Sequence, residues 1–161
     1  KFMSQKYVLL DRDGTLIFEP PDTFHVDKLS QLKVLDGVIS ELKKVIEKGV
    51  KLLMITNQDG LGLPDRPRKD FDVVQSVLIE IFKKNEIVFE DVFVCPHFLS
   101  DGCDCRKPKT GLLDSYLKND IIDLKNSVMV GDRDTDRQFA ENLGIKFIPI
   151  KTNGVFPNLL N

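Results

Sequence analysis

Two carboxylates one residue apart follow an apolar run in the stretch "YVLLDRDGTL", Tyr7 to Leu16. Unpaired carboxylates are costly to bury, and two held close together repel each other. On a strand, Asp11 and Asp13 would point to the same side, because side-chain direction repeats every second residue. A divalent cation such as Mg²⁺ takes oxygen ligands, tolerates a few carboxylates beside water and phosphate, and offsets their repulsion. The pair therefore predicts a site for Mg²⁺-assisted chemistry at the end of a strand.

Other polar residues come at the ends of the later apolar runs. Thr56 closes the run "VKLLMIT" and Asn57 comes directly after it, Asp132 ends "SVMVGD", and a Cys/His cluster begins at the end of "DVFVC". In open α/β sheets, ligands bind outside the carboxyl ends of the strands. We therefore expect these residues to gather at one edge of a sheet.

The elements that must position them alternate along the chain. Apolar runs predict strands, and apolar residues at helical spacing predict helices. A helix over 36–48 is expected to begin at Asp36 as its N-cap and to stop at Gly49. Pro149 lacks a ladder donor, which places the last strand at an edge. The expected strands cover 6–10, 50–56, 91–95, 127–132 and 146–150; the expected helices cover 36–48, 70–84, 112–117 and a stretch ending at Gly144.

This alternation predicts the α/β class, with a doubly wound parallel sheet of about five strands. At 161 residues, 1–161 is most simply one domain. The net charge of −2 gives no reason to expect nucleic acid or membrane as a partner, and no apolar run is long enough for a bilayer. Three clustered cysteines fit a reducing cytoplasm better than a disulfide framework. Lys1 and Phe2 precede Met3, which is consistent with an addition ahead of a native start.

The motif "DRDGT" resembles the first motif of the haloacid dehalogenase (HAD) superfamily of phosphohydrolases, and "MIT", "CRKPK" and "VMVGDRDTD" resemble the next three in order. The resemblance implies that Asp11 is the nucleophile, forming an aspartyl-phosphate. It implies that Asp13 is the general acid/base, which protonates the leaving alkoxide and then activates water. A carboxylate nucleophile divides one difficult displacement into two easier ones.

The same resemblance assigns the remaining site residues. Thr56 would hydrogen-bond the phosphoryl group, and Lys107 would supply a positive charge for phosphate and nucleophile. Asp132 would complete a Mg²⁺ site with Asp11 and Asp13, with Asp136 behind these ligands. Residues expected to assist in binding the substrate are Asn57, Gln58 and Arg106.

A second metal site is predicted by Cys95-x-His97, five intervening residues, and Cys103-x-Cys105. Three thiolates and one imidazole are a common structural Zn²⁺ donor set, and four protein ligands leave no place for a catalytic water. The alternative is a group of cytosolic thiols beside a chance histidine. We expect the loop 95–105 to bind Zn²⁺ and thereby to hold the nearby Lys107 in place.

The lengths and sequences of the loops limit which class of substrate is expected. Only 22 residues separate Asp13 from Asp36, so no cap domain fits and the site should be open. The stretches "DRDGTLIFEPP", "FHVD" and "MITNQDGLG" resemble the histidinol-phosphate phosphatase domain of a bifunctional histidine-biosynthesis enzyme. That resemblance implies Mg²⁺-dependent hydrolysis of the small phosphomonoester L-histidinol phosphate, with a dehydratase domain following in the native protein. Acidic loop residues would attract its ammonium and imidazole groups: Glu19, Asp22, Asp27 and Asp59.

Four alternatives stay open, one of which is a zinc-organised binding protein with an inactive site, although the intact Asp11, Asp13, Lys107 and Asp132 argue against it. Heptose 1,7-bisphosphate phosphatases share the zinc loop, and DNA 3′-phosphatases share D-x-D-G-T, although this chain has no basic stripe. A phospho-acceptor signalling module of the response-regulator type also uses Mg²⁺, Asp, Thr and Lys on a parallel sheet. In such modules, however, the phosphorylated aspartate ends the third strand, where this chain has Cys95.

Overall fold

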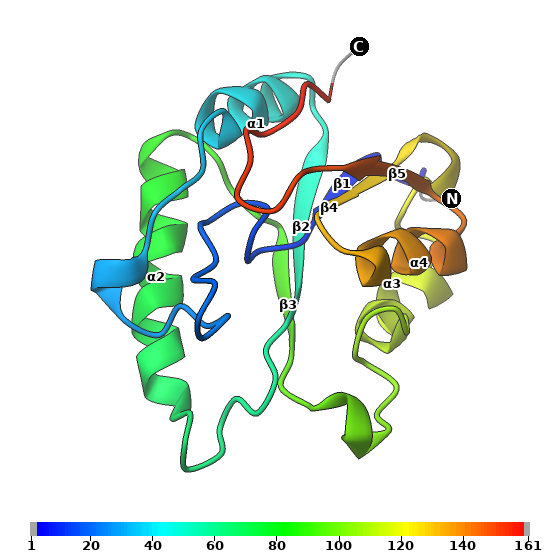
Figure 1. The fold of residues 1–161 in the computed structure, drawn as a ribbon. Coiled ribbons are helices and arrows are strands. Elements are labelled where there is room, and N and C mark those ends of the chain that lie inside the picture. The colour runs from blue at the N-terminus through cyan, green and yellow to red at the C-terminus, as the bar shows by residue number, and fades with distance from the viewer. Residues whose placement is uncertain (1–2, 160–161) are drawn as a thin grey trace.

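A five-stranded parallel sheet forms the centre of the computed structural model, which describes residues 3–159 (Figure 1). The strands are β1 (Tyr7–Leu10), β2 (Lys51–Asn57), β3 (Asp91–Cys95), β4 (Val128–Gly131) and β5 (Lys146–Pro149). The helices are α1 (Val38–Glu47), α2 (Arg68–Lys84), α3 (Asp114–Lys118) and α4 (Asp134–Leu143). The predicted fold class is confirmed. Lys1 and Phe2, which the sequence marks as a possible addition, lie outside the described residues.

The strand order is β3-β2-β1-β4-β5, with all neighbours parallel. β1 is therefore central, between β2 and β4. Strands β2 and β3 are added on one side of β1 and strands β4 and β5 on the other, so the strand order reverses between β1 and β4. Ligands of doubly wound folds bind at such a switch point. The order also differs from the 2-1-3-4-5 order of flavodoxin-like response regulators, which argues against the signalling-module alternative.

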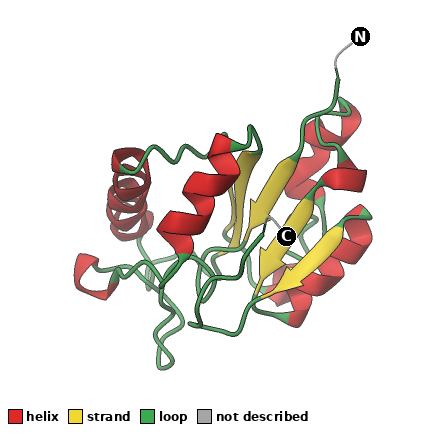
Figure 2. Ribbon diagram, turned by 90° about the horizontal axis from the view of Figure 1, so that it is seen from above, coloured by secondary structure: helices red, strands yellow, loops and turns green. Residues whose placement is uncertain are grey.

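Both faces of the sheet are covered by helices, as the continuous apolar strands predicted (Figure 2). Val8 and Leu10 of β1 belong to a buried cluster that includes residues of α1 and α2. Tyr7 and Leu9, one step along the strand, belong to a second cluster that includes residues of α4. The alternation of side chains along a strand thus gives the single sheet two hydrophobic cores.

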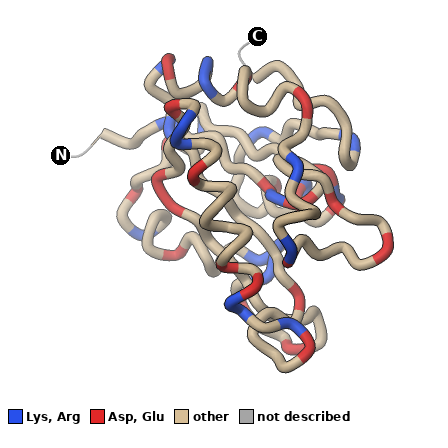
Figure 3. The backbone as a smooth tube through the Cα atoms, turned by 90° about the vertical axis from the view of Figure 1, so that its left-hand side faces the viewer, with Lys and Arg blue, Asp and Glu red and all other residues tan. Residues whose placement is uncertain are grey.

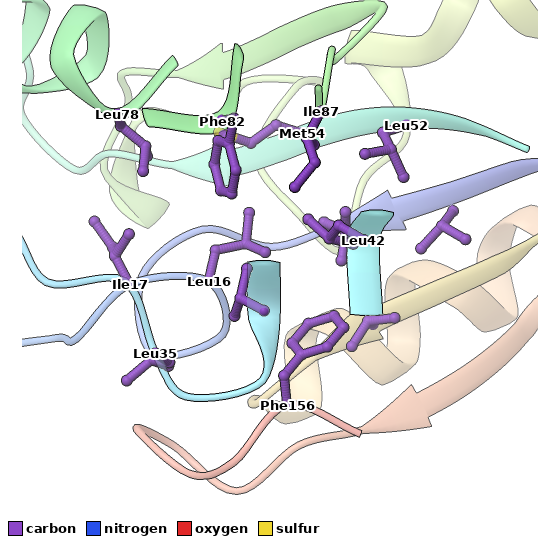
Figure 4. Packing of buried hydrophobic residues seen from close by; sticks show 14 of the residues in the cluster. Leu16, Ile17, Leu35, Leu42, Leu52, Met54, Leu78, Phe82, Ile87 and Phe156 are labelled. Atoms are coloured by element: carbon purple, nitrogen blue, oxygen red, sulfur yellow. The ribbon is translucent and has the colours of Figure 1, made fainter. Parts of the chain in front are cut away.

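The first core extends into the segment after β1 (Figure 4). Leu16 and Ile17 are fully buried there with Leu42 of α1 and Phe82 of α2. Burying side chains of this size stabilises a fold by roughly 1.5–3 kcal/mol each. The turn that carries Asp11 and Asp13 is therefore anchored immediately beyond its two acidic residues.

The element ends lie within about two residues of expectation, and α2, for example, begins at Arg68 and not at 70. The expected N-cap of α1 was wrong. Asp36 is not its N-cap: Gly37 occupies that position at φ 88°, and no side chain caps the helix. The C-terminal segment explains this, because Phe156 N donates to Asp36 O at 2.9 Å and a Cβ on Gly37 would lie 3.3 Å from Phe156 O. β5 is an edge strand, as Pro149 predicted.

The described segments β1–α1 and β2–α2 contain no inserted domain, in agreement with a capless arrangement. Within residues 3–159, no helix has both the length and the apolar character needed to cross a bilayer. Acidic and basic residues are interspersed along the chain in the view of Figure 3, which shows no extended basic stripe.

Candidate active site

A buried ion-pair network lies at the carboxyl end of β1. Lys107 Nζ is 2.8 Å from Asp11 Oδ1 and 2.8 Å from Asp136 Oδ1, and it also donates to Ile55 O at 2.8 Å. Burial alone would lower the pKa of Lys107, but the two carboxylates raise it above its ordinary value. Burial likewise opposes ionisation of Asp11, yet Lys107 lowers the pKa of that carboxyl. Lys107 is thus a fixed cation beside an ionised carboxylate.

Asp132 follows the end of β4 directly and lies close to Asp11. The Thr15 hydroxyl bridges the two residues: Thr15 Oγ1 is 3.0 Å from Asp11 Oδ2 and 3.2 Å from Asp132 Oδ1. Burial, and then the contact with Asp11, raises the pKa of Asp132 to about 8. Gly14 permits this approach: at φ 82° it has no side chain, and a Cβ there would lie 2.5 Å from Asp132 Oδ2. The sequence thus forces two carboxylates together.

Asp13 takes a different environment. Its Oδ2 accepts from Gln58 Nε2 at 2.7 Å, and the same amide nitrogen is 2.7 Å from Thr56 Oγ1. Asp13 Oδ1 lies 3.4 Å from Arg12 Nη1 and has no hydrogen-bond partner among residues 3–159. Gln58 is 1% exposed. Gln58 therefore contacts Asp13 directly. Its amide is buried and is not exposed for the expected contact with substrate.

Lys107 is also held through its main chain. Asn57 Nδ2 donates to Lys107 O at 3.1 Å, and Lys107 N donates to Asn57 Oδ1 at 3.0 Å. One amide side chain thus satisfies both main-chain groups of the lysine, which connects the end of β2 to the loop after the cysteines. Asn57 also lines the cavity over Asp11, so contact with substrate and support of Lys107 are compatible.

That cavity has a volume of about 250 Å³. Asp11, Asp13 and Lys107 lie in its lining, and Arg106 and Asp59 line its wall as an ion pair at 3.1 Å. Other lining residues come from the loop after β1 and from the start of α4: Glu19, Phe24, His25 and Arg133. The size suits a small phosphomonoester.

The acidic loop residues are mostly paired with arginines. Glu19 contacts Arg133 Nη2 at 2.5 and 2.7 Å, and Asp27 contacts Arg66. Asp59 pairs with Arg106 through Oδ2, while its buried Oδ1 has no hydrogen-bond partner within residues 3–159. Of the four acidic residues expected to attract a cationic substrate, Glu19 and Asp59 line the cavity, and each is paired with an arginine.

The four predicted zinc ligands come together at one point. Cys95 Sγ lies 3.1 Å from Cys105 Sγ and 3.7 Å from Cys103 Sγ, while His97 Nδ1 lies 3.2 Å from Cys105 Sγ. One ligand atom from each residue falls within 4.8 Å of all the others. The three cysteines are free thiols. This convergence is what a tetrahedral Zn²⁺ site requires, and it disfavours the alternative of chance thiols.

A second group of potential ligands consists of Asp11, Asp132 and Asp136, whose carboxylate oxygens lie within 4.8 Å of one another. The expected group contained the Asp13 carboxylate, which is held by Gln58 instead. Three hard oxygen donors around one point fit Mg²⁺, and the close approach allowed by Gly14 supports this use. Asp11 and Asp136 are both ion-pair partners of Lys107 at 2.8 Å, so Asp132 is the one of the three without an ion-pair partner among the described residues.

Sequence reasoning missed a cluster beneath the site. Arg12 is fully buried, its three guanidinium nitrogens have no hydrogen-bond partner among the described residues, and it lies 4.7 Å from the Phe71 ring centroid. Arg66 lies over the same ring at 6.0 Å. Arg12 stands between the two aspartates of "DRDGT" without an expected role, and Arg66 lies outside every motif. The apolar neighbours of Phe71 in α2 suggested core packing only, and nothing in the spacing signals a cation on its ring.

Comparison with known proteins agrees with this geometry. The chain is 48% identical over 149 residues to the histidine biosynthesis bifunctional protein HisB of Buchnera aphidicola subsp. Acyrthosiphon pisum (strain Tuc7). It is 45% identical over 146 residues to that of Legionella pneumophila (strain Lens). These matches cover 92% and 91% of this chain but 42% and 41% of the relatives. The chain thus spans about two fifths of the length of the curated relatives that it matches.

A solved structure and a family profile complete the comparison. The D,D-heptose 1,7-bisphosphate phosphatase from B. bronchiseptica, complexed with magnesium and phosphate, superposes with a TM-score of 0.79 at 26% identity, covering 89% of this chain and 79% of that one. The profile described as polynucleotide kinase 3 phosphatase matches residues 6–151. The expected kinship with phosphatases is confirmed, and the chain belongs to the polynucleotide kinase 3 phosphatase family.

Proposed function

We propose that this chain is a phosphomonoesterase that hydrolyses L-histidinol phosphate to L-histidinol and phosphate. The observation that carries the proposal is the Asp11 carboxylate, which lies in the cavity lining with Lys107 Nζ at 2.8 Å and Asp132 beside it. The similarity to HisB proteins supports the choice of substrate. Because those relatives are more than twice as long, we further propose that a dehydratase domain accompanies this one in the native protein.

The proposed reaction has two steps. In the first, an Asp11 oxygen attacks phosphorus and the ester oxygen leaves, which gives an aspartyl-phosphate. In the second, water attacks the same phosphorus and regenerates the carboxylate. Lys107 keeps Asp11 ionised and offers a positive charge to the phosphoryl oxygens, where charge develops in the transition state.

Asp13 is proposed as the general acid and base. Its Oδ2 accepts from Gln58 Nε2, its buried Oδ1 lies 3.4 Å from Arg12 Nη1, and the residue lines the cavity next to Asp11. Protonated, it donates to the leaving alkoxide; ionised, it accepts a proton from the attacking water. Thr56 Oγ1 accepts from Gln58 Nε2, so the Thr56 hydroxyl proton remains free to donate to a phosphoryl oxygen.

Asp11 and Asp132 would hold Mg²⁺. Asp136 would lie behind these two ligands, and Asp13 would lie beside the ion in the cavity lining. The ion would supply charge neutralisation for the nucleophile and the phosphoryl group. Cys95, His97, Cys103 and Cys105 would hold Zn²⁺ in a purely structural role, because four protein ligands fill its tetrahedron. Free thiols fit a cytoplasmic setting, which we propose for this enzyme.

Substrate choice is proposed to come from the cavity wall. Arg106 and Asp59 form one ion pair at 3.1 Å in that wall, so a substrate would contact them together, with the Asp59 carboxylate as the acceptor for a cationic group. A charged carboxylate in a partly desolvated wall discriminates for ammonium or imidazolium over neutral sugar. Acidic and basic residues are interspersed in the view of Figure 3 and the net charge is −2, which does not favour a polynucleotide as substrate.

A second candidate is the hydrolysis of a heptose 1,7-bisphosphate, favoured by the structural neighbour at TM-score 0.79. The two proposals differ in what the cavity wall must recognise, because the sugar bisphosphate carries a second phosphate and no cation. The chain is 48% identical to a HisB protein and 26% identical to the heptose enzyme. Histidinol phosphate is therefore the better fit.

The test is phosphate release with and without Mg²⁺ from four substrates: histidinol phosphate, heptose 1,7-bisphosphate, p-nitrophenyl phosphate and an oligonucleotide 3′-phosphate. We expect the highest kcat/KM on histidinol phosphate. The Asp11→Asn variant should lose both turnover and the acid-stable phosphoryl-enzyme label, because an amide is a poor nucleophile. Faster turnover of the heptose or of the oligonucleotide would overturn the proposed substrate, and full activity of Asp11→Asn would overturn the mechanism.

A further inference from the structure

A buried relay of side chains runs from the loop after β1 to the proposed general acid. It begins at Asp27, passes through Arg66 and Gln58, and ends at Asp13. Arg66 lies in the loop between β2 and α2, outside every recognised motif, and its side chain is only 6% exposed. A buried arginine with this set of contacts calls for an explanation, since long charged side chains are seldom buried without a partner.

Arg66 is fixed at its guanidinium. Its Nε lies 2.8 Å from Asp27 Oδ2, and its Nη2 lies 3.0 Å from Asp27 Oδ1. This two-point contact sets the plane of the guanidinium as well as its position. The same group lies 6.0 Å from the centroid of the Phe71 ring. Arg66 is therefore held in one orientation by a carboxylate and by an aromatic ring.

Arg66 in turn fixes Gln58. Its Nη2 donates to Gln58 Oε1 at 2.6 Å, so the amide oxygen must face the arginine. The amide nitrogen then faces Asp13 Oδ2 and Thr56 Oγ1, both at 2.7 Å. If the amide turned over, its oxygen would face the Asp13 carboxylate and repel it. Arg66 and Asp13 together therefore specify which way the amide lies.

We propose that Arg66 is a positioning residue for the general acid: it fixes the Gln58 amide, which holds Asp13 Oδ2 and thereby sets the orientation of the Asp13 carboxylate. This inference rests on the proposed phosphatase function and deepens it. It also reassigns Gln58 from a contact with substrate to support of Asp13. A catalytic group must be held within a fraction of an ångström, and misplacement by about 1 Å can cost roughly 10²-fold in rate.

The chemistry of the leaving group separates this role from mere stabilisation. An alkyl phosphate leaves as an alkoxide and needs a proton from Asp13, whereas p-nitrophenolate leaves without one. The value of kcat/KM reports only the steps up to release of the first product. Impaired proton donation should therefore lower kcat/KM for the alkyl ester and spare the aryl ester, while damage to the fold or to phosphate binding should lower both.

The experiment compares Arg66→Met with the unchanged protein on histidinol phosphate and p-nitrophenyl phosphate. Methionine retains an unbranched side chain against Phe71 but has no donors. We expect kcat/KM to fall about 10-fold or more on the alkyl ester and less than about 3-fold on the aryl ester, since general acids contribute roughly 10²–10⁴-fold. Equal losses on both esters, or no loss on either, would overturn the proposal.

Four further variants sharpen the result. Arg66→Lys keeps the charge but not the planar fork, so it should show the same selective defect; full recovery would mean that charge alone matters and would refute positioning. In a Gln58→Ala background, Arg66→Met should add no further selective loss. If Arg66→Met does not fold, Asp27→Asn tests the relay from its other end. Arg68→Met is the matched control, since the Arg68 side chain is about half exposed and forms an ion pair with Asp72 on the surface of α2.

The outcomes also separate this inference from the function on which it rests. If the unchanged protein hydrolyses neither ester in Mg²⁺, the proposed function fails. If it hydrolyses both and the Arg66 variants keep the ratio of the two kcat/KM values, the function stands and the relay is refuted. A thermal melt of each variant excludes loss of the folded protein as the cause.

Discussion

Gly14 offers the sharpest test of the active-site geometry, because its replacement by alanine acts in two ways. The residue has φ 82°, a conformation in which a side chain is strained, and its Cβ would lie 2.5 Å from Asp132 Oδ2 and 3.1 Å from Asp132 Cγ. The backbone strain should cost about 1–2 kcal/mol, or roughly 2–8 °C in melting temperature for a chain of this size. The collision should move the Asp132 carboxylate away from Asp11.

The two effects are expected to differ greatly in size. The strain is a modest fraction of an ordinary stability of about 5–15 kcal/mol, so Gly14→Ala should fold. Displacing a metal ligand, in contrast, should lower Mg²⁺ affinity and reduce kcat/KM by roughly 10²-fold. The assays are thermal denaturation, Mg²⁺ titration of activity and phosphate release from histidinol phosphate.

Gly49→Ala provides the matched control. Gly49 has φ 77°, yet a Cβ there would meet nothing within 4 Å. It should show a similar fall in melting temperature with unchanged Mg²⁺ dependence and kcat/KM. If Gly14→Ala keeps full activity, or if both variants lose activity to the same degree, close packing of Gly14 on Asp132 is not what the site needs.

Two further predictions concern Lys107 and the cysteine loop that precedes it. Lys107→Met should lower stability by about 3–5 kcal/mol, because it leaves Asp11 and Asp136 buried without their cation; denaturant unfolding measures the loss, and a change below about 1 kcal/mol would contradict it. Cys103→Ser should lower bound zinc and the melting temperature together, measured by metal analysis and thermal denaturation; full zinc content with a normal melt would show that the loop is not the metal site.

Much of the fold could be predicted from the sequence because local and long-range preferences agree. The apolar strands are buried on both faces, which gives an unbroken hydrophobic signal, and Gly144 ends α4 at φ 79° as a left-handed cap. The predicted N-cap of α1 was wrong for a reason outside any local window. The chain near Phe156 packs over Gly37, so a segment about 120 residues away decides how that helix begins.

The residues of the site likewise include some that the sequence could predict and some that it could not. Asp11, Thr56, Lys107 and Asp132 come together because parallel strands end at one edge, and their motifs reveal that convergence. The roles of Gln58 and Asn57 could not be read from "TNQ", since an amide contacts substrate or supports another residue depending on which neighbours are buried. Arg66 carried no signal at all, because its partners lie in a loop whose path the sequence does not specify.

An open site without a cap domain must obtain its rigidity from its loops, and here the loops are joined to one another. Arg66 joins the loop after β1 to the loop after β2 through Asp27. Gln58 N donates to Cys95 O at 2.7 Å, and Arg106 pairs with Asp59, which join the loop after β2 to the cysteine loop. Ordering a loop costs roughly 1–2 kcal/mol per residue in backbone entropy. Zn²⁺ in the third loop would therefore stabilise more than its own ligands, since each loop that it orders restrains the next one around the cavity.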